Sequence, residues 1–244
     1  QSSPSIGASI SFWEWDFGFG VTGITNSPTT YLSAIGNHNI NLTLTTNQGC
    51  SNIANGTAYI YALPNTAFSL NDVCVYEPIE TNNNSSIENG TLNYSWNFGD
   101  NTAVNTTQNP THNYALAGIY QVDLTTLSNQ NCSSTTTQQV KIYDQPNADF
   151  SVDTTCAETI SQFLDQSSIL TVVNGDFVAN WEWDIDNNTT VDYNSQNIQH
   201  VYSIEGPHTS NLLITTNFGC QASGIKDAMV WPIPEIDYSY QNIC

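Results

Sequence analysis

Positive charge is almost missing from this sequence of 244 residues. It has no arginine and only two lysines, Lys141 and Lys226, against 22 acidic residues, which gives a formal net charge of −20. Most nucleic-acid affinity comes from cations that neutralise phosphates, and anionic membrane surfaces attract basic segments. The composition therefore excludes nucleic acid as a partner and argues against binding to an anionic membrane.

Long apolar stretches and helical stripes are also missing. No segment has the roughly 20 consecutive apolar residues of a membrane-spanning helix, so we expect no membrane insertion in this segment. Only 10% of the residues are charged, and asparagine, threonine, serine and glutamine supply most of the polarity. This composition predicts an extracellular, cell-surface location. The 39% hydrophobic and 11% aromatic content is enough for packed cores, which argues against disorder.

What the sequence does contain is a tandem repeat. Three tryptophan-centred segments, Trp15-Asp16-Phe17-Gly18, Trp96-Asn97-Phe98-Gly99-Asp100 and Trp183-Asp184-Ile185-Asp186, are each followed by an Asn-x-x-Cys segment. One unit is a little over eighty residues long. A period of that length, with a hydrophobic pattern in every unit, favours separate small domains over short solenoid repeats.

Prolines mark the limits of the units. Pro64, Pro146 and Pro234 each follow a strand-like run and precede the first aromatic segment of a unit. We predict domains at residues 1–63, 64–145 and 146–232, and the start of a further one at 233–244. Gln1-Ser2-Ser3 aligns with Gln166-Ser167-Ser168, so the first domain is expected to lack its opening strands and the chain to be a piece of a longer array.

Alternating apolar and polar residues predict β-strands throughout. The pattern is clear in Ile40-x-Leu42-x-Leu44 and in Tyr120-x-Val122-x-Leu124, where the period is two. Turn residues separate two such runs before each Asn-x-x-Cys cysteine, which indicates a hairpin. About seven short strands per unit are typical of an antiparallel sandwich, so the predicted fold class is all-β.

The second unit resembles a PKD (polycystic kidney disease) domain. The similarity lies in Trp96 to Asp100, in Asn109-Pro110-Thr111-His112-Asn113-Tyr114 and in Ala117-Gly118-Ile119-Tyr120. The first and third units match more weakly. The resemblance implies tandem Ig-like β-sandwich domains arranged as an extended array, as in large secreted surface proteins of Bacteroidota.

No catalytic constellation is found. There is no nucleophile with a partnered base and no glycine-rich phosphate loop, and the four histidines are spread over three domains. We therefore predict that the protein is not an enzyme and has no cofactor.

Calcium is the one metal that the sequence suggests. Asp184, Asp186 and Asn188, with Asp192 nearby, offer hard oxygen ligands at alternating positions. The alternative is that these side chains cap turns by accepting hydrogen bonds from backbone N–H groups.

Paired aromatic residues recur on the tryptophan strand. Trp13 precedes Trp15 by two residues and Trp181 precedes Trp183 likewise, so each pair lies on one face of a strand. Such a pair is a candidate sugar-binding platform. The alternative, which we favour, is that Trp15, Trp96 and Trp183 are the core tryptophans of their sandwiches.

The cysteines are expected to be oxidised. They form two series. Cys50, Cys132 and Cys220 lie in the hairpins, and Cys74, Cys156 and Cys244 each follow one of these cysteines at the same spacing. The default pairing is one bond per domain, Cys74–Cys132 and Cys156–Cys220, which leaves Cys50 and Cys244 for partners outside the chain. In the implied Ig-like topology these pairs lie roughly 20 Å apart, too far for a disulfide. We therefore lean towards a cross-domain bond from Cys74 to Cys220, with the default pairing still open.

The loop before the tryptophan strand varies most in length. The interval from cysteine to tryptophan is longer in the third unit, from Cys156 to Trp183, than in the second, from Cys74 to Trp96. We expect Ser168 to Asn180 to form an exposed loop at one pole of its domain.

Three functions fit these features. The first is a non-catalytic extracellular repeat segment of a long adhesin or filament, which acts as a semi-rigid stalk and itself adheres. Its partners are neighbouring domains of the same chain and a glycan or cell-surface protein. The alternatives are a carbohydrate-binding accessory array of a secreted hydrolase and a self-assembling filament subunit.

Overall fold

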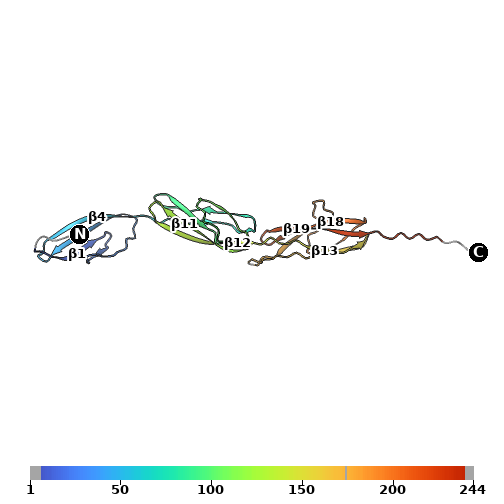
Figure 1. The fold of residues 1–244 in the computed structure, drawn as a ribbon, viewed down its shortest axis with the longest axis horizontal. Helices are drawn as coiled ribbons and strands as arrows, with labels where there is room; N and C mark the ends of the chain where they lie inside the picture. The colour runs from blue at the N-terminus through green and yellow to red at the C-terminus, as the bar shows by residue number, and fades with distance from the viewer. Residues whose placement is uncertain (1–6, 174, 240–244) are drawn as a thin grey trace, which may run out of the picture. The chain divides into compact units, whose positions relative to one another are not determined.

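The computed structural model describes residues 7–173 and 175–239, and every regular element in this part of the chain is a β-strand (Figure 1). The predicted all-β class is confirmed. Among the described residues no helix is long and apolar enough to cross a membrane.

The first repeat forms one antiparallel sheet. Its strands are β1 (Ile10–Asp16), β2 (Thr22–Gly23), β3 (Gly36–Thr46) and β4 (Ser51–Ile60), in the order β2-β1-β3-β4. Trp15 on β1 faces Leu42 on β3, and β3 and β4 form the predicted hairpin.

The second repeat contains one four-stranded sheet and two short strand pairs. The sheet has the order β6-β12-β11-β9, from β6 (Val73–Cys74), β12 (Ser133–Tyr143), β11 (Gly118–Ser128) and β9 (Leu92–Asn97). The pairs are β5 (Phe68–Ser69) with β8 (Asn82–Asn83), and β7 (Pro78–Glu80) with β10 (Thr111–Asn113).

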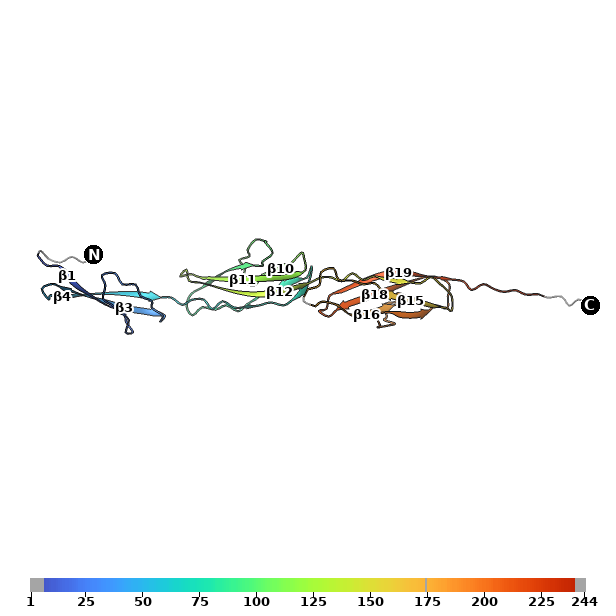
Figure 2. The same cartoon turned by 90° about the horizontal axis from the view of Figure 1, so that it is seen from below.

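The third repeat is a two-layered sandwich. One layer has the order β14-β19-β18-β16, from β14 (Thr155–Cys156), β19 (Gln221–Trp231), β18 (Gly206–Thr216) and β16 (Val178–Asp184). The other has the order β13-β15-β17, from β13 (Phe150–Val152), β15 (Ile160–Asp165) and β17 (Ile198–Val201). Figure 2 shows β18 beside β16 and β19 within this repeat.

Burial along the longest strands locates the cores. In β11 and β18 alternate side chains are buried, and Leu124 and Leu212 are fully buried. The corresponding Leu42 of β3 is only partly buried. In the third repeat a second layer covers this face, whereas residues 7–63 contain a single sheet. That the first repeat lacks its opening strands stays a prediction.

The chain also divides into two compact units that do not follow the repeats. They comprise Gln1–Ala67, Asn84–Tyr94 and Thr125–Thr135 in the first unit, and Phe68–Asn83, Ser95–Leu124 and Thr136–Cys244 in the second. The domain limits proposed from the sequence therefore stay a prediction. All the sites described next lie within one unit or the other.

Candidate functional site

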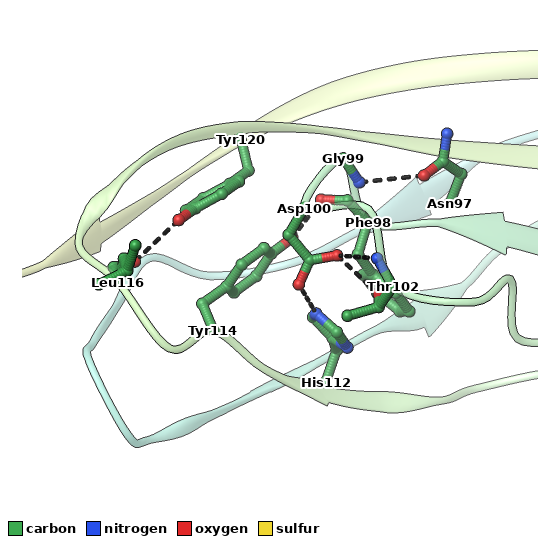
Figure 3. A network of polar contacts seen from close by, with 9 residues as sticks. All are labelled: Asn97, Phe98, Gly99, Asp100, Thr102, His112, Tyr114, Leu116 and Tyr120. Carbon is green, nitrogen blue, oxygen red and sulfur yellow. Dashed lines mark hydrogen bonds and ion pairs between the residues drawn. The ribbon is translucent and has the colours of Figure 1, made fainter.

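A tight turn follows β9 and is held by its own polar side chains (Figure 3). The Asn97 side-chain oxygen accepts a hydrogen bond from the Gly99 N–H at 3.1 Å. The Asp100 carboxylate accepts the Thr102 N–H at 3.1 Å and the Thr102 hydroxyl at 2.6 Å. Gly99 has φ +75°, and a Cβ there would lie 2.4 Å from the Gln121 carbonyl oxygen. Both the backbone conformation and the close approach of β11 therefore require glycine.

His112 of β10 closes this turn. Its Nε2 atom lies 2.7 Å from the Asp100 carboxylate, and the two side chains are only 13% and 14% exposed. The imidazole stacks on Phe98 with ring centroids 4.1 Å apart, and the Tyr114 hydroxyl donates to the Phe98 carbonyl at 2.8 Å. Burial acts to raise the pKa of Asp100, but hydrogen bonds from Thr102 and His112 outweigh it, so the pKa lies below its ordinary value. The network ties the turn to β10.

The third repeat lacks this contact between an aspartate and a histidine. Asn187 stands where the second repeat has Asp100. His200, the counterpart of His112, instead shares a hydrogen bond of 3.1 Å with the Tyr193 hydroxyl. Burial lowers the pKa of His200. The Asp100–His112 contact thus has a structural role in the second repeat, and in the third repeat the Tyr193–His200 hydrogen bond takes its place.

The predicted calcium ligands lie in the turn after β16. Asp184, Asp186 and Asp192 each place one carboxylate oxygen within 4.8 Å of the others, and such a donor set fits a hard cation. The Asp184 carboxylate also accepts backbone N–H groups of Asn188 at 3.0 Å and Thr189 at 2.7 Å. The Asn188 side-chain nitrogen donates to Asp186. Turn capping is therefore observed, while calcium binding stays a prediction.

The core interpretation of the tryptophans is confirmed for two of them. Trp96 and Trp183 are fully buried, whereas Trp15 in the single-sheet repeat is only partly buried. Trp181, the proposed second member of a sugar platform, packs against the core and donates its indole N–H to the Asp165 carboxylate at 2.8 Å. In the third repeat the pair is therefore not a free, flat platform.

A disulfide joins Cys74 to Cys220, with a Cα–Cα distance of 5.7 Å. Cys74 ends β6, which pairs in parallel with the end of β12, and Cys220 lies in the turn between β18 and β19. The bond connects the second repeat to the third. It is the cross-domain pairing that the sequence analysis favoured, and the default pairing of one bond per domain is wrong for these two cysteines.

The default pairing fails because each repeat holds its two cysteines at opposite ends of one strand. Cys156 is the partner of Trp231 at the end of β19, whereas Cys220 lies just before its start. The 11 residues of β19 span ~36 Å, and a disulfide needs Cα atoms within about 7 Å. Cys74 and Cys132 lie in the same way at the two ends of β12.

Side-chain contacts surround the disulfide. The Tyr143 ring stacks on the Phe218 ring with centroids 3.9 Å apart. Val173 is buried in one cluster with both cysteines and Tyr143. The Thr171 N–H donates to the Asp144 carboxylate at 2.8 Å. The connection between the repeats is therefore packed and hydrogen-bonded as well as covalent.

The loop before β16 supplies two of these contacts, which corrects one expectation. Leu170 and Phe177 are exposed as predicted, but Val173 and Asp176 are buried. The end of the predicted loop, from Val178, already belongs to β16. The extra length of this loop and the aromatic Phe218 in the third hairpin were the signals that could have indicated a packed junction.

The other cysteines have no disulfide partner in the described part of the chain. Cys50 and Cys156 are exposed, and Cys132 is partly buried. Cys244 lies outside the described residues. That these four are oxidised remains a prediction.

Comparison with known proteins agrees with this architecture. A family model described as "PKD domain" matches residues 64–142. The PKD1 domain of the metalloprotease PrtV from Vibrio cholerae is 31% identical over 34% of this chain and 98% of that chain, with a TM-score of 0.30. The PKD1 domain of Vibrio anguillarum Epp is 27% identical over 34% and 96%, with a TM-score of 0.32. Three N-terminal domains of the bacteriophage RB49 outer capsid protein Hoc align over 91% of this chain and 88% of that chain at 10% identity, with a TM-score of 0.50, and show the fold alone. With its Trp-Asn-Phe-Gly-Asp turn and its all-β repeats, the chain belongs to the PKD domain family.

Proposed function

We propose that this chain is a segment of a non-catalytic extracellular repeat array, which acts as a stalk for a long surface adhesin or filament and itself takes part in adhesion. The observation that carries the proposal is the Cys74–Cys220 bond between consecutive repeats. A free linker would let neighbouring domains rotate, whereas a disulfide next to the linker removes much of that freedom.

Composition supports the same conclusion. Disulfides persist in oxidising compartments outside the cell, so the Cys74–Cys220 bond fits an extracellular location. A net charge of −20 keeps such chains soluble and apart. The Asp100–His112 contact and the Tyr114–Phe98 hydrogen bond tie the turn after β9 to neighbouring segments, which supports a structural role for these side chains.

Surface location is tested by labelling intact cells of the source with an antibody raised against this chain. The proposal requires labelling without permeabilisation. It also requires long projections, which electron microscopy of the labelled cells would show. Label that appears only after lysis would overturn the surface assignment.

Adhesion is tested with a glycan array and with immobilised host-cell surface proteins. Binding to either supports the adhesive part of the proposal. Glycan binding that is lost in Trp13→Ala, together with a hydrolase domain on the same gene, would instead support the accessory-array function. Trp183→Ala is unsuitable as a binding variant because Trp183 is a core residue.

A further inference from the structure

The third repeat contains a second edge strand like the one that holds Cys74 at the junction. Cys74 pairs with Tyr143 between β6 and β12, and Cys156 pairs with Trp231 between β14 and β19 in the same parallel arrangement. The residue after each cysteine, Val75 or Ala157, donates its N–H to the carbonyl of that aromatic partner, in both cases at 2.8 Å. The two edge strands are therefore built alike.

Their surroundings differ. Cys74 is buried and bonded, and Tyr143 is 3% exposed beneath Phe218. Cys156 is exposed and unbonded, and Trp231 is 54% exposed. The cysteine and its aromatic partner are thus buried in the second repeat and exposed at the same positions of the third.

The hairpin half of the junction also recurs. Two hydrogen bonds close the hairpin of Cys220. The Thr216 N–H donates to the Cys220 carbonyl at 2.8 Å, and the Cys220 N–H donates to the Thr216 hydroxyl oxygen at 3.2 Å. Thr46 and Cys50 make the same two bonds, at 2.9 Å and 3.2 Å. The exposed thiol of Cys50 is therefore presented by a hairpin of the kind that Cys74 captures.

We propose that Cys156 and Trp231 form a docking site for the Asn-x-x-Cys hairpin of a further PKD repeat, sealed by a disulfide to Cys156. The inference deepens the proposed stalk function and rests on it for its biological setting. The bond forms when the hairpin cysteine, held as a mixed disulfide with glutathione, is attacked by the Cys156 thiolate. Glutathione thiolate leaves, so one disulfide is exchanged for another and no further oxidant is needed.

The consequence is a series of overlapping covalent loops. The Cys74–Cys220 loop already contains Cys156. A disulfide from Cys156 to a further repeat would close a second covalent loop, which begins within the Cys74–Cys220 loop and overlaps with it. In an array that repeats this pattern, every residue between the outer bonds lies within at least one closed loop.

The test uses two copies of the chain, because one copy carries both halves of the proposed site. In a Cys132→Ser, Cys244→Ser background, Cys50 and Cys156 are the only unpaired cysteines. In a buffer of oxidised and reduced glutathione we expect covalent dimers and higher oligomers linked from Cys156 to Cys50. Peptide mapping by mass spectrometry should find this pair at least tenfold more often than Cys156–Cys156 or Cys50–Cys50.

Two variants separate docking from random oxidation. Trp231→Ala should slow formation of the Cys156–Cys50 bond several-fold, because it removes the exposed indole against which the incoming hairpin would pack. Ile225→Ala, an exposed apolar change in the middle of β19, is the matched control and should leave the rate unchanged. Statistical pairing of the two cysteines, equal rates for both variants, or glutathione adducts alone would overturn the docking site. The intact Cys74–Cys220 bond in the same samples would keep the proposed stalk function standing.

Discussion

At the scale of single residues, the most constrained position is Gly99. Alanine there must adopt φ +75° and must also move the Gln121 backbone, which lies 2.4 Å from its Cβ. The left-handed conformation alone costs about 1–2 kcal/mol. We expect Gly99→Ala to lower the free energy of unfolding of the second domain by more than ~3 kcal/mol, in the range of other severe backbone defects.

Gly90→Ala is the matched control for this prediction. Gly90 also has positive φ, +116°, but the atom nearest to its Cβ belongs to the flexible side chain of Asn129. Gly90→Ala should therefore cost the conformational penalty and at most the hydrogen bond that the Asn129 side-chain oxygen accepts from the Thr91 N–H. Urea denaturation measures both variants, and equal losses would show that the contact with Gln121 is unimportant.

Asp100 makes the stability of the second domain depend on pH. Its pKa is lower in the folded than in the unfolded state, because the hydrogen bonds of Thr102 and His112 outweigh burial. The stabilisation is thus complete above the unfolded pKa, about 3.9, and is lost as the pH falls through the folded value. Asp100→Asn should cost about 1.5–3 kcal/mol at pH 7, the range for hydrogen bonds to charged groups.

The gap between Asp100→Asn and the natural protein should shrink below pH 4. Urea denaturation at pH 7, 5 and 3 tests this. A gap of constant size across that range would mean that the Asp100 charge contributes nothing.

At the scale of elements, the turn after β16 shows whether its carboxylates serve the backbone or a cation. Asp184 accepts two backbone N–H groups, whereas Asp186 accepts a hydrogen bond from the Asn188 side-chain amide. We expect Asp184→Ala to cost about 1–3 kcal/mol and Asp186→Ala less than about 0.5 kcal/mol. A chelator should leave the melting temperature of the natural protein unchanged within about 2 °C. A drop of many degrees, with equal losses in both variants, would establish a structural calcium site.

Strands and hairpins were predictable because local rules determine them. Alternation in Ile40 to Leu44 and in Tyr120 to Leu124 requires only that one face of a strand be buried. The position of the hairpin cysteines follows from turn residues next to them in the sequence. The Cys74–Cys220 bond could be favoured from topology, since the length of one strand separates the two cysteines of each repeat.

Contacts between repeats were harder to predict. Val173 is one of several apolar residues in a long loop, and its burial depends on Cys74, Cys220 and Tyr143 from other segments. No period in the sequence connects these positions. Likewise, Trp15 has the same motif as Trp96 and Trp183, yet its partial burial depends on which strands cover it.

At the scale of the whole molecule, the disulfide determines how far the chain lengthens under load. Cys74 and Cys220 are 146 residues apart in sequence, so most of the second repeat and most of the third lie inside one closed loop. Force applied to the chain ends passes through the disulfide, and the enclosed residues do not extend even if their domains unfold.

In single-molecule stretching, a reductant should therefore release about 500 Å of additional contour length, at ~3.5 Å per residue. Cys74→Ser should show that length without reductant, while Cys132→Ser should behave like the natural protein because Cys132 is unbonded in the described chain. Equal contour lengths with and without reductant would mean that the bond does not form in solution, and a stalk that depends on it for resistance to force would then be excluded.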